Sequence, residues 1–318
     1  MHFPRHRASS PLAAARGSAL LIVLWVVALL SFMVVTALMV VRQDVETAWS
    51  RESVQRARQL AEMGIAVAAH PGVKPSDPLL RARVSAQESY ETHISTEESR
   101  LHINSLLTEE RRALLERVFV GWGLPESDAE TLVDRMMDWA DEDDFQRLKG
   151  AEGSHYRDMG IPGRPYNRKL RTVEEMALVS GMEQLTLARP DWQDWVTFHG
   201  SGQLDLNEAP AELIAVFTGA SLSRAQTLVA QRSGSDGIAH TVDDLPLTSV
   251  EEALTMLGVG AEAEALTPLL TVKGSTTRIE STGRIGDYAR TVVVVLRKSG
   301  GRPQILEWKE MVTDQPSE

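Results

Sequence analysis

Residues 16–41 of the chain read RGSALLIVLWVVALLSFMVVTALMVV, and no charged side chain follows Arg16 in this run. As a helix, Ser18–Val41 would rise roughly 36 Å, which is enough to cross a hydrocarbon core of ~30 Å. No acidic residue precedes the run, but three arginines do: Arg5, Arg7 and Arg16. Because Asp44 and Glu46 follow it, the charge pattern keeps the N-terminus in the cytoplasm. The stretch therefore predicts one membrane-spanning helix, with the C-terminal part of the chain outside the cytoplasm.

The helical pattern continues beyond the apolar run. No proline occurs between Ser18 and His70, and Pro71-Gly72 is the first strong stop. One helix of about 53 residues, roughly 80 Å long, is the simplest prediction. It comprises a membrane segment at 18–41 and an external continuation at 42–70. The continuation carries small and apolar residues at spacings of three or four: Val45, Trp49, Ser53, Ala57, Leu60, Gly64 and Ala68. A membrane anchor with a short amphipathic stem is the alternative.

The composition limits the classes of protein to which the chain can belong. It has 318 residues and a net charge of −11, which becomes −14 without the three arginines of residues 1–17. This balance is unfavourable for phosphate binding, and aromatic residues are only 5% of the chain, which is low for stacking on bases. No cysteine is present, so disulfides and thiolate metal sites are excluded.

Strand-like segments flank a helical region. Residues 71–103 hold a linker and the first strands, and Tyr90–Ile94 and Arg100–Ile103 are predicted to form a hairpin. Residues 271–318 hold the last strands. We expect these strands to form an antiparallel sheet, with the long N-terminal helix packed on one face. Two short segments are expected to join the sheet: 195–199 and 203–206.

Residues 104–270 have a helical period and contain an internal duplication. The first helix is expected to open at Ser105, with Glu109 and Glu110 in its first turn. Ala129-Glu-Thr-Leu-Val133 shares four of five residues with Ala225-Gln-Thr-Leu-Val229. The region is therefore predicted as an all-α insertion with two related helical hairpins, although a coincidence of so short a match is the alternative.

The second copy also resembles a helix-hairpin-helix, a motif that binds the DNA backbone through hairpin amides and nearby basic residues. Its hairpin, Phe217–Leu222, contains one glycine, and only Arg224 and Arg232 supply positive charge nearby. In an acidic chain this makes nucleic acid an unfavourable partner. A packing or partner-docking module is the preferred interpretation, and a membrane-anchored DNA-binding protein is the alternative function.

The basic leader and the apolar run resemble the class III prepilin signal of type IV pilins and type II secretion pseudopilins. The resemblance rests on the leader ending in Gly17 and on Ser18–Leu30. It implies that a prepilin peptidase cuts after Gly17 and that Ser18 becomes the methylated first residue. Cleavage after Ala37 by signal peptidase is a rival interpretation. Most members have Glu at the fifth mature position, where this chain has Ile22.

The departure at Ile22 is typical of one family, the minor pseudopilin K of the general secretion pathway. That resemblance covers nearly the whole mature chain, with its most specific segments at Leu20–Leu30, Asp138–Asp144, Gly150–Glu152 with Tyr156, and Leu206–Pro210. It implies an α+β fold, in which a long N-terminal transmembrane helix packs on an antiparallel pilin-like sheet that carries a SAM-like or helix-hairpin-helix-like insertion. Ile22, Leu24 and Trp25 are the expected membrane and assembly contacts.

The function implied by the resemblance is structural and non-enzymatic. The chain would cap the tip of the type II secretion pseudopilus and initiate its assembly, as a single-pass inner-membrane protein with a periplasmic domain. The implied partners are two other minor pseudopilins in a ternary tip complex, the major pseudopilin below, the prepilin peptidase and the inner-membrane assembly platform. A periplasmic hydrolase is a third interpretation, but no catalytic motif supports it.

The densest acidic cluster lies at residues 138–144. Closely spaced carboxylates are ligands that calcium prefers, and calcium binding is a property of the resembled family. The expected ligands are Asp141 and Asp143, together with Asp144 and Glu152 if the loop folds back. A solvated, capped helix end is the preferred alternative, because the spacing does not match an EF-hand. No cofactor is required by this interpretation, and calcium is the one possible metal.

Overall fold

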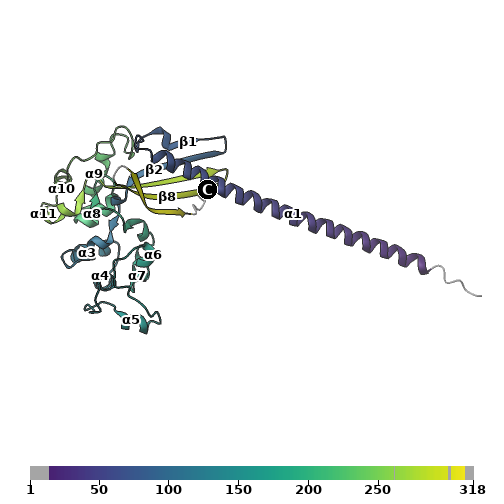
Figure 1. Cartoon of the computed structure of the whole chain (residues 1–318), viewed down its shortest axis with the longest axis horizontal. Helices are drawn as coiled ribbons and strands as arrows, with labels where there is room; N and C mark the ends of the chain where they lie inside the picture. Colours follow the sequence, from purple (N-terminus) through teal and green to yellow (C-terminus); the bar gives the residue numbers. More distant parts are fainter. Residues whose placement is uncertain (1–13, 261, 300–301, 312–318) are drawn as a thin grey trace, which may run out of the picture. The chain divides into compact units, whose positions relative to one another are not determined.

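The computed structural model describes residues 14–260, 262–299 and 302–311. Its contacts divide into two compact units, Met1–Arg56 and Ala57–Glu318. Helix α1, Ala14–Ala68, supplies the described part of the first unit and the first residues of the second (Figure 1). The chain is already helical at Ala14, the first described residue, four residues before Ser18. The helix ends at Ala68, two residues before the predicted last helical residue, His70.

The second unit contains a five-stranded antiparallel sheet in the order β1-β2-β7-β8-β9. A β-bulge interrupts the pairing of β8 with β9 between Val295 and Leu296. The strands are β1 Arg81–Arg83, β2 Glu88–Thr96, β7 Thr276–Ile285, β8 Tyr288–Ser299 and β9 Arg302–Met311, and the 3-10 turn η1, Pro78–Leu80, precedes β1. The α+β fold class is confirmed.

The last turns of α1 pack on one face of this sheet, as predicted. Gly64 allows a close approach, because a Cβ there would lie 2.2 Å from the hydroxyls of both Ser281 and Thr92. Those hydroxyls form a buried hydrogen bond of 2.8 Å. The apolar contacts of this interface include Ala61, Ile65, Ala68, Leu80, Ile279, Val292, Val294 and Leu296.

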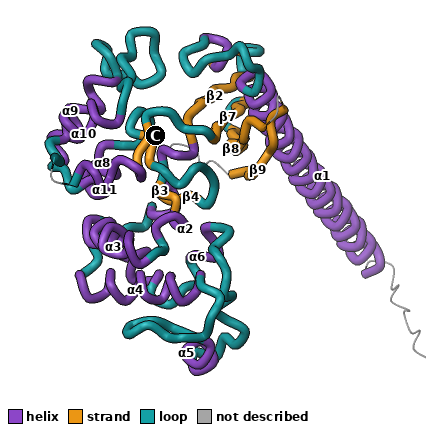
Figure 2. Tube along the Cα trace, turned by 60° about the vertical axis from the view of Figure 1, so that its left-hand side comes forward, coloured by secondary structure: helices purple, strands orange, loops and turns teal. Residues whose placement is uncertain are grey.

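All of residues 97–275 lie in the single connection between β2 and β7. Figures 1 and 2 show two groups of helices in this region, one with α3, α4 and α5 and the other with α8–α11. One continuous hydrophobic core runs through both groups. The helices are α2 Ile103–Leu106, α3 Arg112–Gly121, α4 Glu126–Ala140, α5 Gly153–Asp158, α6 Val173–Met176, α7 Met182–Ala188, α8 Ala211–Thr218, α9 Leu222–Arg232, α10 Val250–Leu257 and α11 Ala263–Leu266. The 3-10 turns are η2 Glu97–Ser99, η3 Glu109–Arg111, η4 Trp192–Trp195 and η5 Thr267–Leu269.

Each group is closed by a pair of short parallel strands. In the first, β3 (Leu101–His102) pairs with β4 (Val196–Thr197). In the second, β5 (Leu204–Asp205) pairs with β6 (Leu270–Thr271). Both groups thus begin with a strand, continue through helices and return to a strand beside the first, which supports the predicted duplication.

An asparagine holds the same position in both groups. The Asn104 side chain donates to the carbonyl of Leu170 at 2.7 Å and accepts from its amide at 3.1 Å. Asn207 donates to the carbonyl of Leu247 at 3.1 Å and accepts from its amide at 2.8 Å. In both copies the anchored leucine lies just before a capped helix, α6 or α10.

The capped helices carry a repeat that the sequence analysis missed, Val173-Glu-Glu175 and Val250-Glu-Glu252. The hydroxyls of Thr172 and Ser249 accept from the third helical amide at 3.1 Å in each copy. The glutamates in turn accept from the amides of Arg171 and Thr248. The similarity between the two helical groups therefore extends beyond the hairpins.

Three details of the strand and helix prediction are wrong. Residues 90–94 and 100–103 do not form a hairpin, because β2 pairs with β7 and β3 pairs with β4. Segments 195–199 and 203–206 contribute to the parallel pairs and not to the antiparallel sheet. The helix expected from Ser105 is split into α2, η3 and α3, since Thr108 has an extended backbone.

Candidate functional site

The apolar part of α1 exposes its side chains. Ile22, Leu24 and Trp25 are 62%, 66% and 74% exposed. The described residues contain one helix that is long and apolar enough to cross a membrane, the stretch Leu20–Ala68 of α1. Such a surface is expected to be covered by lipid or by other helices. The predicted cleavage site between Gly17 and Ser18 lies within α1, and residues 1–13 of the predicted leader are outside the described residues.

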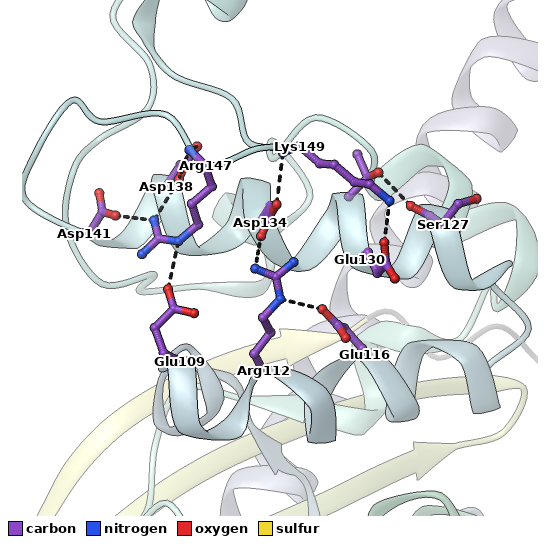
Figure 3. Close-up of polar contacts among 11 residues, drawn as sticks. Glu109, Arg112, Glu116, Ser127, Glu130, Asp134, Asp138, Asp141, Arg147 and Lys149 are labelled. Atoms are coloured by element: carbon purple, nitrogen blue, oxygen red, sulfur yellow. Dashed lines mark hydrogen bonds and ion pairs between the residues drawn. The ribbon is translucent and has the colours of Figure 1, made fainter.

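The acidic segment after α4 is organised around Arg147 (Figure 3). Its Nη1 donates to the fully buried Asp138 at 2.7 Å and to Asp141 at 2.5 Å, and its Nε reaches Glu109 at 3.4 Å. The backbone amide of Arg147 also faces the Asp138 carboxylate. This partner explains how Asp138 can be buried, because an unpaired buried charge is costly.

Gly150 completes this arrangement. A Cβ at Gly150 would lie 1.8 Å from Asp138 Oδ2, so a larger residue cannot occupy the position without displacing the carboxylate. Lys149 next to it donates its amide to Asp134 at 3.0 Å, and Arg112 pairs with the same carboxylate at 2.6 Å. The loop after α4 is thereby fixed to α3 and α4 by two buried aspartates (Figure 3).

Glu152 lies beside this network without a partner. Its side chain is only 4% exposed, and neither carboxylate oxygen accepts a hydrogen bond from a described residue. Burial, followed by repulsion from Asp138, Asp141 and Asp144, raises the pKa of Glu152 to about 7. Burial also raises the pKa of Asp141, although Arg147 opposes the shift. A buried carboxylate without a donor is unusual and indicates an unmet need for a proton or a cation.

The other predicted ligands have different surroundings. Asp143 caps the amide of Phe145 at 2.8 Å. Asp144 accepts from the Asn167 side chain at 2.9 Å, and the Oδ1 of Asn167 has no donor. Asn167 was missed by the sequence analysis. Its positive φ of 47°, which asparagine tolerates, is a local feature that gives no metal signal in a sequence.

The described residues contain no group of three acidic or histidine side chains positioned to hold a metal. The donor chemistry nevertheless fits a hard cation in part. Unpartnered oxygens belong to Glu152, Asp141 and Asn167, and oxygen ligands are those that calcium takes. Asp143 and Asp144 lie in the same loop, but their own hydrogen bonds already engage one oxygen each.

Aromatic residues support the loop from the inside. Trp139 packs edge-on against Tyr156 and Tyr166, at ring-centroid distances of 5.5 and 5.2 Å. Its indole donates to Glu175 at 3.1 Å, and Arg168 holds the same carboxylate. These contacts join the loop to the capped helix α6.

The arginines of the helix-hairpin-helix-like unit contact the protein's own backbone. Arg232 is buried and donates to the carbonyls of Leu206 and Ala209. Arg224 donates to the carbonyl of Leu257 at 3.1 Å. These bonds fix α9 to neighbouring segments and argue against a role for either side chain in contacting phosphates.

Comparison with known proteins adds a family and a fold. Residues 99–190 match the family described as Type II secretion system (T2SS), protein K. No curated protein matches the chain. A solved structure titled the crystal structure of the GspK-GspI-GspJ complex from the enterotoxigenic Escherichia coli Type 2 Secretion System contains a similar chain. The similarity has a TM-score of 0.58 at 16% identity and covers 86% of this chain and 98% of that chain.

The family match falls on the first helical group and the acidic loop, whereas the shared fold extends over most of the chain. The antiparallel sheet and the long apolar N-terminal helix agree with the structural similarity, and the helical connection between β2 and β7 contains the residues of the family match. Residues 99–190 therefore match a T2SS protein K domain, and the chain as a whole shares its fold with a chain of the GspK-GspI-GspJ complex structure.

Proposed function

We propose that the chain caps the tip of the type II secretion pseudopilus, initiates its assembly and so serves the export of folded proteins from the periplasm. The role is structural and not enzymatic. Residues 18–41 anchor it in the inner membrane, and the second unit lies in the periplasm. Its partners are two other minor pseudopilins, the major pseudopilin below, the prepilin peptidase and the inner-membrane assembly platform.

The observation that carries the proposal is the size of the insertion between β2 and β7. Residues 97–275 add two helical groups to a sheet of only five strands. A second subunit stacked above would have to accommodate that bulk. Ile22 supports the same position, because a carboxylate there would serve a neighbour's ammonium group within the membrane, and a terminal subunit has no such neighbour.

Labelling tests the tip position. Because the chain lacks cysteine, a Val242→Cys variant carries one thiol, at a side chain that is 93% exposed. In cells that assemble pseudopili, we expect maleimide–gold label at one end of each fibre. Label distributed along the fibres, or its absence from them, would contradict the proposal. Mass spectrometry of the same protein should find a methylated N-terminus at Ser18, whereas an intact Met1 or a start at Leu38 excludes prepilin processing.

We also propose that the acidic loop binds calcium, with Glu152 and Asp141 as the central ligands and Asp143, Asp144 and Asn167 close by. The unpartnered oxygens of Glu152, Asp141 and Asn167 favour it. Bound calcium would neutralise the repulsion among these carboxylates. We expect calcium to raise the melting temperature of the full chain in detergent. In Glu152→Gln, the calcium concentration that gives half of this increase should be at least tenfold higher. A melting temperature unchanged by millimolar calcium would exclude the site.

A further inference from the structure

A cavity of about 380 Å³ lies between the sheet and the helical region. Strands β7, β8 and β9 line one side, and segments 171–174 and 193–199 line the other. It opens on the sheet face opposite α1. Neighbouring residues of a strand point to opposite faces, and Ile279 contacts the α1 interface whereas Arg278 lines the cavity.

The acidic side chains of the cavity mostly have partners. Glu97 accepts from the hydroxyl of Thr197 at 2.7 Å and lies 3.5 Å from Arg278. Across the cavity, Lys309 pairs with Glu174 at 3.3 Å and His199 pairs with Glu307 at 3.4 Å. These pairs join β9 to the helical region and leave the cavity walls fixed.

Arg100 has no such partner in the described part of the chain. Its guanidinium makes no hydrogen bond or ion pair with the described residues, although it lines the cavity. Burial and the nearby Arg278 lower the pKa of Arg100, while Glu97, Asp194 and Glu280 act in the opposite direction. The contacts of Arg278 with Glu97 and Glu280 are long, at 3.5 Å each. Two guanidinium groups therefore share a partly desolvated space with donors to spare, which is the environment in which arginine binds carboxylates.

The neighbouring strand suggests the form of the ligand. Strand β9 pairs with β8 on one edge and with no described strand on the other. It lines the cavity through Leu306, Glu307, Lys309 and Met311. An unpaired edge can accept an added strand, whose side chains reach adjacent pockets.

We propose that an extended acidic segment from a partner protein pairs along β9 and places a carboxylate in the cavity, where Arg100 binds it. The site is independent of the acidic loop and of the membrane anchor. A free dicarboxylate offers the same chemistry without the strand pairing, so the two sources can be distinguished.

Calorimetric titration of the full chain in detergent tests the site. The probes are acetyl-Val-Glu-Val-Glu-Val-amide, its counterpart with Gln in place of Glu, and succinate. We expect the acidic peptide to bind, the Gln peptide to bind at least about tenfold more weakly, and succinate to bind more weakly than the peptide. Equal binding of both peptides overturns the carboxylate assignment, and succinate binding as tight as the acidic peptide overturns the role of β9.

Variants locate the binding. Arg100→Gln should lower the affinity for the acidic peptide about tenfold or more. Arg284 is an exposed arginine on the same strand as Arg278, and Arg284→Gln should leave this affinity unchanged. Because Arg100 has no partner among residues 14–260, 262–299 and 302–311, its replacement should leave the melting temperature unchanged or raise it. Unchanged affinity in Arg100→Gln, or a clear loss of stability, overturns the proposal. A chain ending at Met311 should bind the peptide as the full chain does, and tighter binding would assign the cavity to residues 312–318 instead.

Discussion

At Glu152 the burial of a carboxylate links ionisation to stability. Its pKa is raised to about 7 in the folded chain, whereas an unfolded glutamate titrates near ~4.3. Between these values the unfolded state loses its proton while the folded state keeps it. Stability is therefore expected to fall as the pH rises from about 4.3 to 7 and to level off above that range.

The Glu152→Gln variant tests this prediction in calcium-free buffer. Gln keeps the shape of the protonated acid without a charge, so the variant should melt at a higher temperature than the parent at pH 8 and equally at pH 4.5. Glu142→Gln is the matched control, because Glu142 is exposed in the same loop. The same difference in melting temperature between Glu152→Gln and its parent at both pH values would contradict the raised pKa.

Among the elements, the contact of α1 with the sheet depends on the absence of a side chain at Gly64. Gly64→Val would place methyl groups where the Ser281 and Thr92 hydroxyls lie, so the buried bond between them would break or the helix would shift. We expect a loss of about 2 kcal/mol or more in urea unfolding of the full chain. Ala66→Val changes an exposed position of the same turns and should cost less than about 1 kcal/mol. Helix propensity alone would make Gly64→Val slightly more stable than the parent, because valine is a better helix former than glycine, so an unchanged or increased free energy of unfolding would exclude the close contact.

Elements set by local pattern could be predicted, and those set by distant pairing could not. The long helix follows from an unbroken run without proline, and the β-branched residues of β8 identify a buried strand. By contrast, β3 was assigned to a hairpin because its partner, β4, lies almost a hundred residues away. The acidic loop was found by its charge density. Three features of the loop depend on how residues 141–168 fold back on α4, which no local pattern encodes. They are its anchoring by Arg147, the burial of Glu152 without a hydrogen-bond donor, and the proximity of Asn167.

In the molecule as a whole, Glu98 joins the helical region to the sheet. It is buried, and its carboxylate accepts from the backbone amides of Ser201, Ser275 and Thr276 and from the Ser275 hydroxyl. Burial acts to raise the pKa of Glu98, but these hydrogen bonds outweigh it and lower the pKa. The stabilisation is therefore present above the unfolded pKa and is lost as the pH falls through the folded pKa.

We expect Glu98→Gln to lower the free energy of unfolding by about 1–3 kcal/mol at pH 7. The substitution replaces one carboxylate oxygen by an amide NH₂ group, which would face backbone amides that are themselves donors. The difference from the parent chain should shrink as the pH falls below about 4. Limited proteolysis should cut the variant faster near residues 97–99 and 272–275. The exposed Glu251→Gln is the control. Unaltered proteolysis together with an unaltered unfolding midpoint would exclude a joining role.

The placement of the helical region between β2 and β7 also determines the order in which the chain can fold. Residues 88–96 pair with residues 277–285, so this central pairing must wait until nearly the whole polypeptide has been synthesised. The two helical groups close over shorter separations and can form earlier. Until then β2 has an unpaired edge that can pair with another chain. A nascent chain arrested before residue 276 would therefore have a folded helical region and an incomplete sheet, and would be the form most exposed to degradation.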